Sequence, residues 1–344
     1  MVPPGYFYAP RYVILMIVSL VALIVLLKDR TPVNQPAFIP LFFFMVFLMI
    51  SSFLAPVPMT AWIGSPFRFT GATTWYACIV LFILASSCRK AEKLLGYLCA
   101  TAAVVSSLAV LQYFGINLVP HEPAREGLIA YGTLPHPNFL GTYTVFILPA
   151  AAIFYLRTQK WPWLLCSALI YAGLLVSLCR GSWMAGAIGI ALVVFFALKD
   201  KEKRRPLLLL GLAFLIVTLA LLPARDGLLL ARMLSVPVEA GKALHFEDAA
   251  GSHRLFIWKK LLRLIPHFWA FGVGPDHLIY GRLALPDDSI VDKAHNIFLE
   301  IAVTMGVFAL ASYLAFLCFI LRPPRSEAGF APSVMVSAKI MGNC

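Results

Sequence analysis

Charged residues are scarce in this 344-residue chain: Asp, Glu, Lys and Arg make up only 13% of it, whereas 61% is hydrophobic. That composition leaves too little polar surface to cover a water-soluble globule of this length. Of the charged residues, the acidic ones are fewer, with 16 Asp and Glu against 28 Lys and Arg. The composition excludes an ordinary soluble domain and indicates a polytopic membrane protein.

Motifs for metals and cofactors are also missing. The seven cysteines lie in or beside apolar stretches or at the C-terminal end, without CxxC spacing, and predict neither a disulfide nor a zinc site. The chain has no Gly-rich phosphate loop, no GxSxG elbow and no paired-Asp metal motif in its polar connections. We therefore expect no cofactor and no metal, and chemistry that depends on His, Arg and carboxylates.

Long apolar stretches dominate what is present, and about nine are long enough, or nearly so, to cross a bilayer core that needs about 20 residues. Their length predicts helices rather than strands. The stretches are residues 12–27, 37–55, 75–88, 94–111, 139–156, 163–178, 182–198, 207–222 and 297–321. The expected fold is an all-α polytopic membrane protein with about nine transmembrane helices.

Basic residues fall on every second connection, for example Lys28 with Arg30 and the run from Lys199 to Arg205. Because Lys and Arg near span ends favour the cytoplasm, this places the N-terminus outside and the long polar connection 223–293 on the extracytoplasmic face. The excess positive charge serves topology and anionic headgroups, so no nucleic-acid partner is expected.

No repeat or second soluble domain is visible, so we expect one transmembrane domain over residues 1–321. The connection 223–293 forms its extracytoplasmic loop subdomain and is expected to contain short amphipathic helices. Residues 322–344 lack apolar periodicity and contain three prolines, which predicts a disordered or altered C-terminal tail.

Residues 252–269 read as an amphipathic helix within that loop. Its basic side chains project from the face opposite the apolar one, as in a helix that lies among headgroups; they are Lys259, Lys260, Arg263 and His267. Arg254 instead lies on the apolar side, about one helical turn from Trp258 and in line with Ile265. Either an anionic group meets Arg254, or it snorkels to water from a frayed first turn.

Two further residues carry similar alternatives. Arg180 lies in the short junction between the stretches 163–178 and 182–198, where a charge either marks a functional site or merely caps a helical hairpin. His295 lies at the start of the last stretch, where the positive end of a helix disfavours imidazolium and a neutral ring can act as a general base. The ordinary alternative is an interfacial histidine that hydrogen-bonds a helix-end amide.

Four motifs, in this order, resemble the O-antigen ligase and polymerase superfamily of bacterial membrane glycosyltransferases. They are HPNFLG at 136–141, SLCRGS at 177–182, SHRLFIW at 252–258 leading to GVG at 272–274, and AHNIFLE at 294–300. The last is the most specific, because a His-Asn pair after a long loop and before a span is hard to obtain by chance. The resemblance covers about residues 115–321.

The resemblance implies an enzyme that takes a glycan from an undecaprenyl-pyrophosphate carrier and joins it to a lipid A-core, a growing glycan or another surface acceptor. It implies a site on the outer face of the cytoplasmic (inner) membrane, with membrane lipids as further partners. On this sequence, Arg180 and Arg254 match the family's donor-pyrophosphate arginines and His295 its candidate base.

Five residues are expected in supporting roles: Asn138, Trp258, Gly272, Gly274 and Asn296. Trp258 either packs against lipid or sugar or belongs to an interfacial aromatic belt, and the glycines are expected to permit a tight turn. Two arginines can stabilise a pyrophosphate leaving group without a divalent metal. Direct displacement at the anomeric carbon predicts inversion.

Other functions remain open at this stage. Ligase and repeat-unit polymerase differ only in their acceptor. A lipid-linked sugar transporter or flippase would also need many spans, but it predicts charges near mid-span, where Glu300 is almost alone. A third alternative is a scaffold that assembles other envelope enzymes. It does not explain why Arg180, Arg254 and His295 occur together. Relatives commonly have one or more spans after the His-Asn span, which puts the activity of this chain in question.

Overall fold

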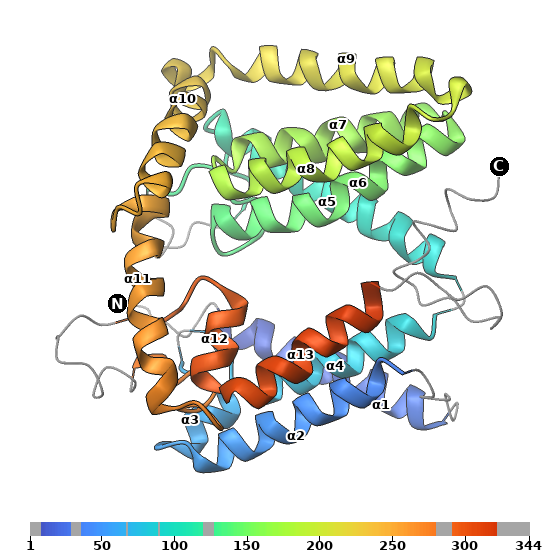
Figure 1. The fold of residues 1–344 in the computed structure, drawn as a ribbon. Coiled ribbons are helices and arrows are strands. Elements are labelled where there is room, and N and C mark those ends of the chain that lie inside the picture. Colours follow the sequence, from blue (N-terminus) through green and yellow to red (C-terminus); the bar gives the residue numbers. More distant parts are fainter. Residues whose placement is uncertain are drawn as a thin grey trace. The chain divides into compact units, whose positions relative to one another are not determined.

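The computed structural model describes residues 8–28, 36–66, 68–88, 90–119, 127–279 and 291–321, and every regular element in these ranges is a helix (Figure 1). This confirms the predicted all-helical fold. The α-helices are α1 (Tyr8–Lys28), α2 (Phe38–Leu54), α3 (Pro58–Ile63), α4 (Ala72–Ser86), α5 (Ala91–Tyr113), α6 (Pro137–Thr158), α7 (Trp161–Val176), α8 (Arg180–Ala197), α9 (Arg204–Leu221), α10 (Ala224–Leu244), α11 (Ala250–Leu264), α12 (Ile297–Thr304) and α13 (Gly306–Leu321). Short 3-10 helices cover Lys201–Lys203 and Ile265–His267.

Each apolar stretch of the sequence except the last coincides with one helix. Within the described ranges, five helical segments are long and apolar enough to cross a membrane: α1, α5, α6, α8 and Lys201–Leu221, which contains α9. Shorter apolar helices are α2, α4, α7 and α13. Length and composition therefore support a multi-pass membrane protein, and the count of about nine spans remains a prediction.

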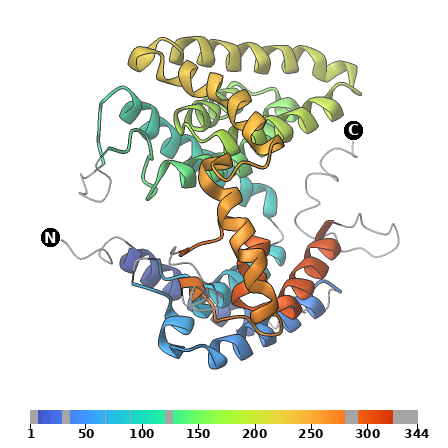
Figure 2. The ribbon, with the colours of Figure 1, turned by 60° about the vertical axis from the view of Figure 1, so that its left-hand side comes forward.

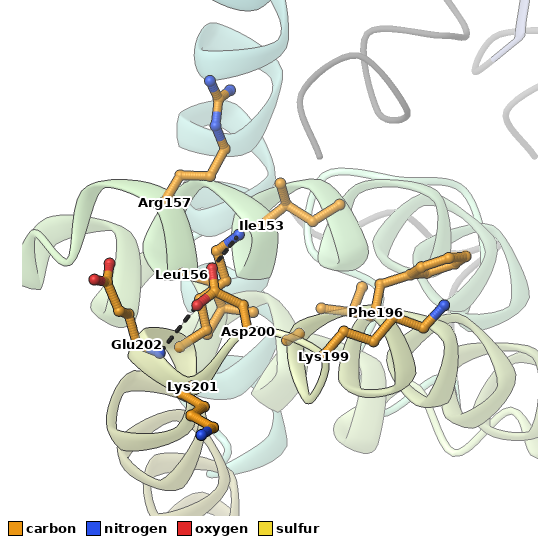
Figure 3. A pocket seen from close by; sticks show the side chains of 11 residues that line it. Ile153, Leu156, Arg157, Phe196, Lys199, Asp200, Lys201 and Glu202 are labelled. Atoms are coloured by element: carbon orange, nitrogen blue, oxygen red, sulfur yellow. Dashed lines mark hydrogen bonds and ion pairs between the residues drawn. The ribbon is translucent and has the colours of Figure 1, made fainter. Parts of the chain in front are cut away.

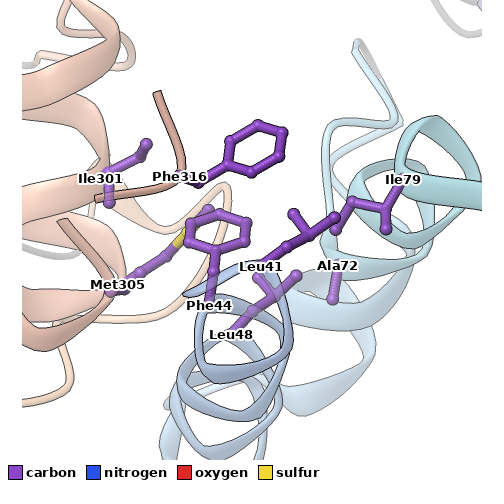
Figure 4. Packing of buried hydrophobic residues seen from close by; sticks show 9 residues of the cluster. Leu41, Phe44, Leu48, Ala72, Ile79, Ile301, Met305 and Phe316 are labelled. Carbon is purple, nitrogen blue, oxygen red and sulfur yellow. The ribbon is translucent and has the colours of Figure 1, made fainter. Parts of the chain in front are cut away.

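The chain divides into two compact units. The first takes its described residues from Met1–Arg89 and Glu239–Val336. In it α13 packs along α2, and α1 packs along α4 (Figures 1 and 2). Its core joins α2, α4 and the α12–α13 region through residues such as Phe44, Leu48 and Met305 (Figure 4).

The second unit takes its described residues from Lys90–Val238. Here α6 and α7 pack against each other and against α5, α8 lies on α6, and α9 lies on α7. Its core contains small residues beside large ones, including Ala102, Ala151 and Leu148, all fully buried. Small residues let helix backbones approach closely, which is the usual basis of packing between apolar helices.

The prediction of a single helix over residues 297–321 is wrong, because the structure divides this segment into α12 and α13. Met305 leaves the helical region and Gly306 has φ +88°. The break frees main-chain groups that a continuous helix would pair internally. The carbonyls of Val303 and Thr304 instead accept the N–H groups of Val273 and Gly274, at 3.0 and 2.8 Å. Buried main-chain groups thus keep their partners.

The predicted loop 223–293 is largely helical where it is described. It contains α10, whose first turn includes three left-handed residues at 225–227, and α11, which covers most of the predicted amphipathic segment. Lys260, expected on the solvent face of that helix, is only 5% exposed, and its Nζ lies 4.9 Å from the centre of the Phe256 ring. The predicted tail, residues 322–344, lies outside the described residues.

Candidate active site

His295 directly precedes α12 and has a left-handed backbone, with φ 49°. Asn296 is the N-cap of that helix: its Oδ1 accepts the N–H groups of Phe298 and Leu299 at 3.0 and 3.3 Å. Asparagine suits this position because its short side chain reaches the N–H groups that the first helical turn leaves without partners. Asn296 therefore fixes where α12 begins and, with it, where the histidine projects.

Two residues before the histidine, a buried ion-pair network holds the chain. The Nζ of Lys293 lies 2.9 Å from Oδ1 of Asp276 and 3.1 Å from Oε1 of Glu300, and these three side chains are only 16%, 4% and 12% exposed. Asp276 also accepts the N–H of Ser65 at 2.6 Å and the hydroxyl of Thr70 at 2.8 Å. The network ties the segment before α12 to the connection between α3 and α4.

The charges in this network stabilise one another. Burial by itself would raise the pKa of Asp276, but Lys293 and the hydrogen bonds lower it below its usual value. Burial likewise opposes the charged form of Lys293, but Glu300 and Asp276 raise its pKa. We infer that the pair stays ionised, because each partner compensates the desolvation of the other.

Ala294 connects this network to α11. Its N–H donates to Oε2 of Glu300 at 2.7 Å, and its carbonyl accepts the indole N–H of Trp258 at 3.0 Å. The residue beside the histidine is therefore held from both sides. Trp258 thus uses its polar atom on the protein's own main chain, next to His295.

Arg254 lies one helical turn before Trp258, and the two therefore share a face of α11. Its side chain is half-buried and makes no hydrogen bond or ion pair with another residue in the described ranges. The sequence leaves two alternatives for this guanidinium, an anionic partner or contact with water, and no carboxylate of the described chain supplies the partner.

His295 has a lowered pKa. Partial burial of the ring is the largest cause, and the positive charges of Arg254 and Arg68 act in the same direction. Asp292 and Glu300 oppose the shift without cancelling it. The ring is therefore neutral near pH 7 and has a nitrogen able to accept a proton.

The sequence did not single out Arg68. It lies in the connection between α3 and α4 and forms an ion pair with Asp292, with a distance of 2.5 Å between Nη2 and Oδ2. One signal was available: this connection is one of those predicted to face outward, where the positive-inside rule expects few basic residues. The positive-inside rule therefore does not account for Arg68, which made it a candidate for a role in the site.

Gly272 and Gly274 are packed against the break between α12 and α13. Gly272 has φ +73°, and a Cβ on it would overlap the backbone of Thr304. The adjoining chain is held there because the N–H of Val307 donates to the carbonyl of Trp269 at 2.7 Å. Gly272 allows the close approach of the two backbones, and Gly274 donates its N–H to the carbonyl of Thr304; the tight turn stays a prediction.

Arg180 belongs to the second unit and is the first residue of α8, at the predicted junction after α7. Its Nη1 donates to the hydroxyl of Ser235 at 3.2 Å, and nearby Arg232 donates from Nε to the carbonyl of Leu178 at 3.1 Å. Both partners come from α10, which sequence analysis treated as part of a loop. The junction is thus braced by side chains of α10.

Asn138 also belongs to the second unit, in the first turn of α6. Its N–H donates to Nδ1 of His136, the N-cap, at 3.1 Å, and its own side chain is exposed. Burial lowers the pKa of His136, which favours the neutral ring that this cap requires. The HPN motif therefore starts a helix.

The described residues form no cluster of three or more His, Cys, Asp or Glu that could hold a metal ion. What they define is a helical membrane protein with a neutral histidine between positive charges at a helix start. Residues 164–314 match the O-antigen ligase family, and this match supports the superfamily that the motifs of the chain resemble. Searches of curated proteins and of solved structures gave no match.

The matched range contains Arg180, Arg254 and His295. The match supports a multi-pass membrane enzyme for glycosyl transfer of the O-antigen ligase or polymerase type, with lipid-linked glycans as the implied substrates.

Proposed function

We propose that this protein transfers an oligosaccharide or polysaccharide from undecaprenyl pyrophosphate to an acceptor hydroxyl at the outer face of the cytoplasmic membrane. The observation that carries the proposal is the environment of His295, which combines a lowered pKa with a segment braced by Lys293 and Trp258. A general base needs both a free nitrogen at working pH and a fixed position.

In the proposed reaction His295 takes the proton of the acceptor hydroxyl as its oxygen bonds to the anomeric carbon. The bond from that carbon to the pyrophosphate oxygen breaks, and the carrier leaves with the electron pair. Attack from the opposite side inverts the anomeric centre. The proton on His295 then passes to solvent and restores the base.

Arg254 is proposed to bind the departing pyrophosphate. Its guanidinium is half-buried and has no anionic partner within the described residues, so a ligand phosphate would supply the missing counter-charge. Negative charge grows on the pyrophosphate as the bond breaks, and a fixed guanidinium stabilises it most at that moment. The family resemblance alone assigns Arg180 the same ligand. No metal is required in this scheme.

The proposal is tested with purified protein in detergent, an undecaprenyl-pyrophosphate oligosaccharide as donor, and EDTA present throughout. The acceptor panel contains lipid A-core and a lipid-linked repeat unit of the same glycan. We expect transfer to one of them, which distinguishes ligase from polymerase. Folded protein that transfers to neither acceptor, or that transfers only after a divalent metal is restored, would contradict the proposal as written.

The pH dependence of the same reaction tests the electrostatic part of the site. Removing the positive charge in Arg68→Gln is expected to raise the pKa of His295, so the fall in kcat/KM on the acidic side begins at a higher pH. Asp292→Asn removes a negative charge that raises the pKa of His295. It is therefore expected to move the acidic fall in kcat/KM to lower pH. Because Arg68 and Asp292 are ion-paired, equal shifts in one direction would indicate a structural effect and contradict this role.

A further inference from the structure

The second unit contains a cavity of about 560 Å³, and none of the residues assigned to catalysis lines it. It is formed by the C-terminal ends of α6 and α8 and by the connection from α8 to α9, residues 199–203 (Figure 3). The two helices α6 and α8, and the segment Lys201–Leu221 that begins in this connection, are each long and apolar enough to cross a membrane. The cavity therefore lies where apolar helices end and polar chain begins.

The lining is chemically divided. The helices contribute apolar side chains, among them Ile153, Leu156 and Phe196, which Figure 3 shows beside the charged connection. The remaining lining holds four basic residues, Arg157, Lys199, Lys201 and Lys203, against the two acidic residues Asp200 and Glu202. The cavity thus offers a hydrocarbon wall together with a net positive edge.

The acidic residues do not neutralise the whole edge. Asp200 is engaged internally, because it pairs with Lys203 at 3.2 Å and accepts the N–H of Glu202 at 3.0 Å. Lys199 lies over the Phe195 ring at 4.6 Å and has no carboxylate partner among the described residues. Lys201 forms no hydrogen bond or ion pair within the same ranges. Two exposed ammonium groups thus remain for a ligand.

We propose that this cavity binds an anionic phospholipid, with its phosphate at Lys199 and Lys201 and the start of its acyl chains along Ile153, Leu156 and Phe196. Basic pockets between helices at a membrane surface have the charge that anionic headgroups require. The positive-inside rule explains basic residues at a span end, but it does not require them to border an apolar cavity. Only a ligand with both an anionic group and an apolar part would contact the basic edge and the apolar wall together.

The test compares phosphatidylglycerol with phosphatidylcholine of the same acyl chains, added to purified protein in neutral detergent and followed by native mass spectrometry. Wild type is expected to retain phosphatidylglycerol preferentially. At about 1 kcal/mol per lysine, Lys199→Gln with Lys201→Gln is expected to weaken that binding about 30-fold. The matched control, Lys90→Gln with Lys93→Gln, removes two exposed charges from another predicted inner connection and is expected to keep the preference.

Three outcomes would overturn the proposal. Equal retention of both lipids by wild type would show that the phosphate charge is not recognised. An equal loss in the two double variants would reduce the effect to overall charge. Displacement of the lipid by inorganic phosphate at the same concentration would identify a free-anion site in which the apolar wall plays no part. Unchanged thermal unfolding of both double variants excludes misfolding as the cause of lost binding.

Discussion

Replacing His295 with asparagine is expected to lower kcat of glycan transfer by about a hundredfold to ten-thousandfold, the usual contribution of a positioned general base. The choice of asparagine follows from the backbone. His295 has φ 49°, a conformation that asparagine adopts readily and alanine adopts at greater cost. His295→Asn therefore removes the base while preserving the start of α12, whereas His295→Ala adds backbone strain to the chemical loss.

The matched control is His267→Asn, at an exposed histidine in the 3-10 helix after α11 of the same unit. It is expected to keep wild-type kcat. Thermal unfolding of both variants in detergent should match wild type, which separates lost chemistry from lost structure. Transfer by His295→Asn within a few-fold of wild type, with the same dependence on pH, would remove His295 from the mechanism.

The sequence predicted the helices because apolar length is a local property. Every apolar stretch except the last coincides with one helix, and α11 covers most of the amphipathic segment at 252–269. The break in the last helix was not predictable in this way. It depends on the 269–274 chain, which lies some 30 residues earlier and donates hydrogen bonds to the freed carbonyls of Val303 and Thr304.

The same distinction applies to the site. His295 and Arg254 were predicted from their positions on a helix and from the motif order. Arg68 was not, because its effect on His295 arises from a chain segment more than 200 residues away. Glu300 stood out as an ionisable residue within an apolar stretch, but its partner Lys293 became evident only from the fold. Local pattern predicted the candidate groups of the site, and the tertiary contacts around them became evident only from the fold.

Replacing Lys293 with methionine is expected to destabilise the first unit by about 3–5 kcal/mol, the typical effect of breaking a buried ion pair. Methionine fills similar volume but leaves the carboxylates of Asp276 and Glu300 without their shared counter-charge. Thermal unfolding in detergent, followed by tryptophan fluorescence, measures the loss. Transfer activity at a permissive temperature is also expected to fall, because the network holds the chain two residues before His295.

The control is Lys259→Met, which breaks the pair with Asp248 at 2.7 Å, whose side chains are 45% and 60% exposed. Exposed pairs contribute about 0–1 kcal/mol, so little change is expected.

The pH dependence of stability separates loss of the ion pair from loss of packing in Lys293→Met. In wild type the lowered pKa of Asp276 stabilises the fold above its unfolded pKa, and this stability is lost as pH falls. Without Lys293, burial raises that pKa and protonation relieves the unpaired charge, so the gap between Lys293→Met and wild type should narrow as pH falls. A gap that stays constant with pH would show that packing, and not the ion pair, accounts for the loss.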